Sequence, residues 1–106
     1  MRKTDLWIGL ADVAPNALCD FLDRRKVKGA WVYVVAFATG QRGFVQRVKK
    51  SLTTLNLMTR SVDEVELVSA LRARSGLSKE LRRLVAYVKR EGAVGVGTFF
   101  PYKSKT

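Results

Sequence analysis

The stretch Ala30-Trp-Val-Tyr-Val-Val-Ala-Phe-Ala38 is the longest apolar run in the chain, and the fold prediction is built on it. In a β-strand successive side chains point to opposite faces. Here the alternation is one of size: Trp31, Tyr33, Val35 and Phe37 share one face, and Ala30, Val32, Val34, Ala36 and Ala38 share the other. Because neither face is polar, we expect a central strand covered on both sides, with helices approaching closely on the small face. The run is far shorter than the roughly 20 apolar residues that a membrane-spanning helix needs.

The segments around this run alternate between strand and helix patterns. Leu6–Leu10, Leu57–Ser61 and Ala93–Phe100 are predicted strands. Pro15–Lys26, Gln41–Leu55 and a segment from Ser78 to Gly92 are predicted helices. Proline suits the first turn of a helix because its missing N–H is not needed there. Ser78 is a typical N-terminal cap, and Gly92 stands where a left-handed C-terminal cap belongs.

Residues Val62–Val68 allow two interpretations. Ser61-Val-Asp-Glu64 matches a capping box, which favours a helix as far as about Arg74, ended by Gly76. The same segment could instead prolong the preceding strand. We favour the helix.

Together these elements predict a single α/β domain over residues 1–106. Strand–helix–strand units cross over right-handed and give parallel neighbours. We therefore expect a two-layer sandwich, an approximately four-stranded mixed sheet with helices packed on it. The polar tail Lys103–Thr106 is expected to fray.

The composition excludes the catalytic arrangements that depend on histidine. The chain has 20 Lys and Arg against 9 Asp and Glu, a net charge of +11, and no histidine. Without histidine there is no Ser–His–Asp or Cys–His arrangement. Cys19, the single cysteine, is expected to be a half-buried structural thiol, and it suits a reducing cytoplasm because it allows no internal disulfide. We therefore predict a cytoplasmic protein that is not an enzyme and holds no metal or cofactor.

The positive charge predicts an acidic partner. Two predicted helices carry most of it, with few acids nearby to neutralise it. A row of cations along a helix can follow a phosphate backbone, although it can also be an ordinary solvated surface. The candidate binding residues are Arg47, Lys49 and Lys50 on the first helix and Arg82, Arg83, Lys89 and Arg90 on the second.

Aromatic residues offer a second way to contact nucleic acid, since unpaired bases stack on exposed rings. Trp31, Tyr33 and Phe37 share a strand face, and Phe99, Phe100 and Tyr102 lie near the end of the chain. The basic-aromatic pattern of RNA-recognition strands is missing, because Arg42-Gly43-Phe44 lies at a predicted helix start. Packing of these rings in the core is therefore the favoured interpretation.

The layout resembles that of small immunity proteins from bacterial toxin–immunity pairs, including those of contact-dependent growth inhibition. The resemblance covers Ala30–Ala38, Gly43–Leu52, Leu57–Val68, Leu81–Gly92 and Val94–Tyr102 as architecture and hydrophobic pattern. It implies a non-enzymatic protein that binds and neutralises one toxin, and the charge then implies a toxin domain with an acidic face. The alternative is a small basic nucleic-acid-binding protein that contacts phosphates through two basic helices.

Overall fold

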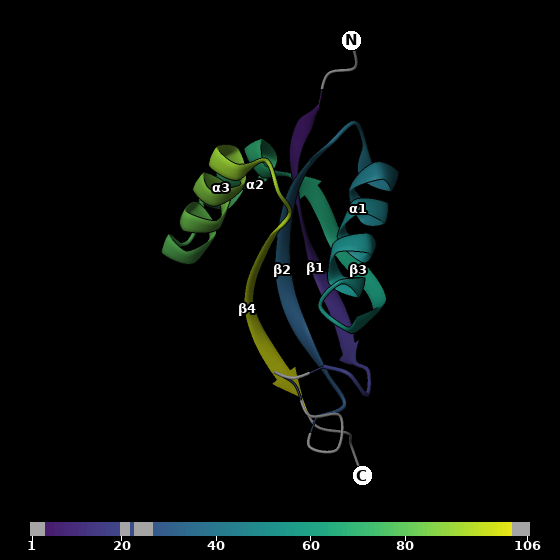
Figure 1. Cartoon of the computed structure of the whole chain (residues 1–106). Coiled ribbons are helices and arrows are strands. Elements are labelled where there is room, and N and C mark those ends of the chain that lie inside the picture. The colour runs from purple at the N-terminus through teal and green to yellow at the C-terminus, as the bar shows by residue number, and fades with distance from the viewer. Residues whose placement is uncertain (1–3, 20–21, 23–26, 103–106) are drawn as a thin grey trace.

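The computed structural model describes residues 4–19, 22 and 27–102 (Figure 1). This part of the chain forms four strands and three helices. In chain order they are β1 (Asp5–Pro15), β2 (Gly29–Ala38), α1 (Gln41–Thr53), β3 (Leu57–Leu67), α2 (Val68–Ser75), α3 (Lys79–Glu91) and β4 (Gly95–Tyr102). The frayed tail predicted for 103–106 lies outside the described residues.

The sheet has the order β3-β1-β2-β4, and every neighbouring pair is antiparallel. The predicted α/β fold, with a four-stranded sheet and helices packed on it, is confirmed, but the expected mixed sheet is wrong. β2 and β3 do run in the same direction, as a strand–helix–strand unit requires. β1 lies between them and is antiparallel to both, so no parallel pair forms.

The expected parallel pairing rests on a helix predicted over Pro15–Lys26, between the first two strands. Pro15 is the last residue of β1 and pairs with Leu57. Residues 16–19 form a turn in which the Asn16 side chain accepts a hydrogen bond from the Leu18 N–H at 2.8 Å. The rest of that predicted helix, apart from Leu22, falls on residues 20–26, which lie outside the described part. Because β2 begins beside the end of β1, with Ala30 paired to Val13, the two strands form an antiparallel pair.

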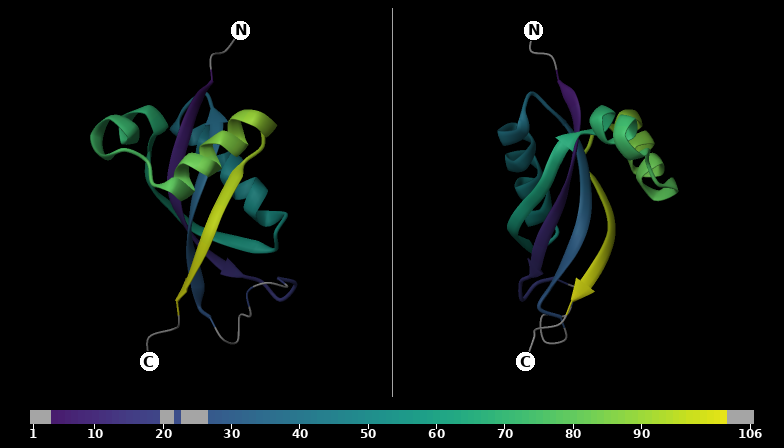
Figure 2. Two further views of the ribbon diagram at one scale, coloured as in Figure 1. Left: turned by 90° about the vertical axis from the view of Figure 1, so that its left-hand side faces the viewer. Right: turned by 180° about the vertical axis from the view of Figure 1, so that it is seen from behind.

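Helices lie on both faces of the sheet, rather than in the two layers predicted (Figures 1 and 2). On the small face of β2, α1 contributes the buried side chains Phe44, Val48 and Leu52. The closest approach is at Gly9, where a Cβ atom would lie 3.0 Å from a ring carbon of Phe44. The prediction that the small face admits a close helix is confirmed.

On the opposite face of the sheet, α2 and α3 pack over the part that contains Ile8 and Val35. Val68, Val85 and Val88 form a second core cluster with Ile8 and Val35. The predicted caps of α3 are confirmed, because the Ser78 hydroxyl accepts a hydrogen bond from Leu81 N–H at 3.2 Å and Gly92 is left-handed. No helix in the described ranges is long and apolar enough to span a membrane.

The helix preferred from Ser61 to Arg74 is wrong over its first half, where β3 continues to Leu67. Pairing with β1 as far as Trp7–Leu67 overrides the local capping box. The Ser61 hydroxyl donates to the Asp63 carboxylate at 3.0 Å instead of capping a helix. α2 starts only at Val68, and it ends at Gly76 as expected.

Candidate functional site

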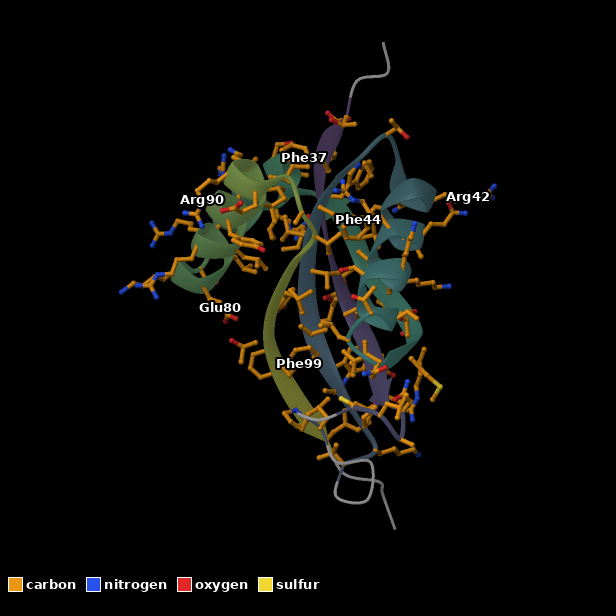
Figure 3. All side chains as sticks on the ribbon, viewed as in Figure 1. Phe37, Arg42, Phe44, Glu80, Arg90 and Phe99 are labelled. Carbon is orange, nitrogen blue, oxygen red and sulfur yellow. The ribbon has the colours of Figure 1, made fainter. Side chains whose placement is uncertain are left out.

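The seven predicted binding residues belong to two helices that lie on opposite faces of the sheet. Figure 3 shows this directly, since Arg42 on α1 and Arg90 on α3 point away from the sheet in opposite directions. The predicted cations therefore do not form one continuous surface. Arg47, Lys49 and Lys50 belong to α1, whereas Arg82, Arg83, Lys89 and Arg90 belong to α3, and all seven are exposed.

Arg47 has a structural role that the sequence did not reveal. Its Nη1 donates to the Phe37 carbonyl at 2.7 Å, and its Nη2 donates to the Gly92 carbonyl, also at 2.7 Å. The side chain thus links α1 to the end of β2 and to the C-terminal cap of α3. Both carbonyls lie in parts of the chain where a regular backbone ladder ends, so a guanidinium with several donors suits them.

The cations of α3 keep most of their charge unneutralised. Glu80, near the start of the helix, accepts a hydrogen bond from the Thr98 N–H at 2.9 Å. Hydrogen bonds from the Thr98 hydroxyl and N–H lower the pKa of Glu80, so this charge is directed toward β4. Arg90 pairs with Glu91 at 3.1 Å and lies 5.9 Å from the centre of the Tyr87 ring. Lys79, Arg82, Arg83 and Lys89 make no ion pair with any described residue.

On the face of the sheet that carries α2 and α3, the strands continue beyond the start of α3 without a helix packed on them. β1 has 11 residues and spans about 36 Å, whereas the 13 residues of α3 span about 20 Å. Figure 2 shows the lower parts of β2 and β4 extending past both α2 and α3. The shorter helices therefore leave part of this face exposed.

Cross-strand register places aromatic side chains on this uncovered part. Directly paired residues of an antiparallel sheet point to the same face. Trp31 pairs with Asp12 on one side and with Phe100 on the other, and Leu10 pairs with Tyr33. We call this surface the open sheet face, formed by Leu10, Asp12, Trp31, Tyr33, Phe100 and Tyr102.

The exposure of these rings corrects part of the sequence interpretation. The prediction that Trp31, Tyr33 and Phe37 share a face is confirmed. Phe37 and Tyr33 pack against the second core cluster, as core packing requires. Phe100 is 50% exposed, so core packing is wrong for this ring.

A polar network fixes one end of the open sheet face. The Tyr102 hydroxyl donates to the Asp12 carboxylate at 2.5 Å and accepts from Arg60 Nη1 at 2.9 Å. Arg60 Nη2 donates to the Lys28 carbonyl at 3.0 Å. Burial, followed by the hydrogen bond to Asp12, raises the pKa of Tyr102. The network joins β1, β3 and β4 to Lys28, the residue that precedes β2.

Gly29 makes this network possible. A Cβ atom on Gly29 would lie 2.6 Å from the Tyr102 hydroxyl oxygen, so only glycine lets this side chain cross β2 to reach β1. The ring of Tyr102 then lies 6.2 Å from that of Trp31, tilted by 37°. The Tyr102 ring is thereby held near Trp31, and its hydroxyl bonds the exposed cation Arg60.

A pocket of about 740 Å³ lies beneath the connection between α2 and α3. An ion pair between Arg74 and Glu66, 2.9 Å long, forms part of its wall. Tyr33 lines this pocket as well as the open sheet face, so the two adjoin.

No family model, no curated protein and no solved structure matches this chain. The resemblance to immunity proteins therefore stays a prediction.

Proposed function

We propose that the protein binds nucleic acid, without catalysing a reaction on it, through the exposed cations of α3. The observation that carries the proposal is the row of unpaired cations along this helix in a chain of net charge +11. Lys79, Arg82, Arg83 and Lys89 have no acidic partner among the described residues, and Glu80 is turned toward Thr98. Neutralising such charges by phosphates releases counterions, which is the main source of non-specific affinity for nucleic acid.

The proposal predicts binding with little sequence preference. Phosphate contacts position a nucleic acid but carry no sequence information. A cytoplasmic location, as the single cysteine suggests, forms part of this proposal.

The test is a salt titration with a labelled oligonucleotide, followed by fluorescence anisotropy. Each lost phosphate contact should lower the slope of log affinity against log salt by roughly one. Arg82→Ala/Arg83→Ala should therefore lower the slope by about two. The matched control is Lys49→Ala/Lys50→Ala on the opposite side of the molecule, which should leave the slope unchanged. An effect in the control pair alone would reject α3 as the binding surface.

A second candidate function is the neutralisation of a toxin. Trp, Tyr and Arg are the residues that most often dominate protein interfaces, and the open sheet face and its border carry Trp31, Tyr33 and Arg60. The same positive charge would accelerate association with an acidic toxin domain. Co-expression with the neighbouring gene product should then yield a one-to-one complex. A basic protein that binds no oligonucleotide even at low salt, but does form such a complex, would favour this candidate over nucleic-acid binding.

A further inference from the structure

We infer that the open sheet face stacks the unpaired bases of a single strand, so that the protein prefers single-stranded nucleic acid to a duplex. The inference rests on the proposed function and deepens it. The cations of α3 account for attraction to any polyanion, whereas the open sheet face would select the form of nucleic acid that is bound.

The spacing of the rings is the first argument. Phe100 and Tyr102 lie two residues apart on β4, which separates them by about 6.8 Å along the strand. Adjacent bases of a duplex strand rise by only about 3.4 Å. Successive bases can therefore reach both rings only if the nucleic acid is extended to about twice its duplex rise. An unpaired strand can stretch in this way, and a base-paired one cannot do so without unstacking.

The availability of the rings is the second argument. Phe100 is 50% exposed and is the direct cross-strand neighbour of Trp31. The hydrogen bonds of Tyr102 to Asp12 and Arg60 hold the next ring in place before any ligand binds. A surface that is already ordered loses little conformational freedom on binding.

The distribution of charge is the third argument. Arg60 lies at one end of the open sheet face, and the first turn of α3 begins beside the middle of β4, where Glu80 bonds Thr98. A strand crossing the rings would thus have Arg60 near one end of its path and Lys79, next to the hydrogen-bonded carboxylate of Glu80, near the other. Two carboxylates would repel the phosphates of the strand. That of Asp12 is hydrogen-bonded to Tyr102, whereas that of Asp63 is exposed on β3. The expected path therefore follows β2 and β4, away from β3.

The experiment compares three probes of similar charge: an oligo(dT) strand, a blunt duplex with half as many base pairs as that strand has nucleotides, and inorganic polyphosphate, which has no bases. The wild-type protein should bind oligo(dT) more tightly than the duplex. Phe100→Leu and Trp31→Leu should each weaken oligo(dT) binding by roughly 5- to 150-fold, the usual loss for one stacked base. Both should leave polyphosphate binding unchanged.

Two further variants make the result interpretable. Tyr87→Leu removes another exposed ring, 40% accessible on α3, and should leave the preference for oligo(dT) intact. Phe100→Tyr keeps a stacking ring and should restore binding. Since Phe100 is half-exposed, its variants remain informative even if Trp31→Leu fails to fold.

The possible outcomes separate the two proposals. Equal affinity for strand and duplex, with no effect of Phe100→Leu, would overturn the stacking inference while leaving nucleic-acid binding by α3 intact. Absence of binding to every polyanion at low salt would overturn both. Capture of an acidic protein by the open sheet face, with no oligonucleotide bound, would also overturn the inference and favour a protein partner.

Discussion

Phe44 anchors α1 to the sheet, and truncating it should remove a large part of the stability of the domain. Its side chain is fully buried against Gly9, Val62 and Val65 on the small face. Phe44→Ala combines lost burial with a cavity and should cost about 3–5 kcal/mol. Domains of this size are stable by only about 5–15 kcal/mol in total. The variant should therefore lose between about a fifth and all of its free energy of unfolding.

Urea denaturation followed by circular dichroism would measure this loss. With a slope of about 1.5 kcal/mol per molar urea, the midpoint should fall by about 2–3 M. A shift below about 0.5 M would refute the placement of Phe44 in the core.

A double-mutant cycle makes the test specific to the contact with Gly9. Gly9→Ala alone introduces a Cβ atom 3.0 Å from the Phe44 ring and should cost about 1–3 kcal/mol through overpacking. Combined with Phe44→Leu, which frees space at that point, the cost should be smaller than the sum of the single variants by at least about 0.5 kcal/mol. Strict additivity would mean that the two residues do not touch.

Three further predictions concern other parts of the fold. Val34→Asp should prevent folding, because an unpaired buried charge costs several kcal/mol; a cooperative thermal transition at the wild-type midpoint would contradict this placement of β2. Ser78→Ala removes the cap of α3 and should cost about 1 kcal/mol in chemical denaturation, whereas Ser75→Ala on exposed α2 should change stability by less than about 0.5 kcal/mol. The pKa of Tyr102 is raised above 10.0 in the folded state, so the unfolded chain loses this proton first, and stability should fall as the pH rises from about 10 toward the folded value. Tyr102→Phe cannot ionise and should show a smaller fall over that range in alkaline denaturation; an equal fall would mean that Tyr102 is not coupled to folding.

Some local signals in the sequence were reliable guides to single elements, whereas the capping box at Ser61 and the proline at position 15 were not. The size alternation of Ala30–Ala38 correctly predicts which residues of β2 share a face, and the caps Ser78 and Gly92 correctly bound α3. These signals depend on neighbours in the chain, such as the serine hydroxyl and the N–H three residues later. Strand order does not depend on them. The insertion of β1 between β2 and β3 follows from long-range pairing, which also drew Val62–Leu67 into a strand.

The candidate site was predictable only in part, for a similar reason. Helical periodicity identifies the exposed cations of α1 and α3, but it does not say which face of the sheet each helix covers. The hydrogen bonds of Arg47 to Phe37 and Gly92 join residues far apart in the chain, and no spacing reveals them. The exposure of Phe100 depends on how far α3 reaches along the strands, which only the assembled fold determines.

The position of Arg47 also bears on how the molecule opens. Its guanidinium connects the layer of α1 to the cap that ends α3, around the end of β2. Parts of a protein with fewer buried contacts exchange their amide hydrogens through local opening, at a lower free energy than global unfolding. Loss of the Arg47 hydrogen bonds would free the last turn of α3 while the paired central strands stayed closed. Amide exchange should then accelerate around Lys89–Gly92 and stay slow in β1 and β2, so that one side chain on the opposite layer controls how often this end of the helix opens.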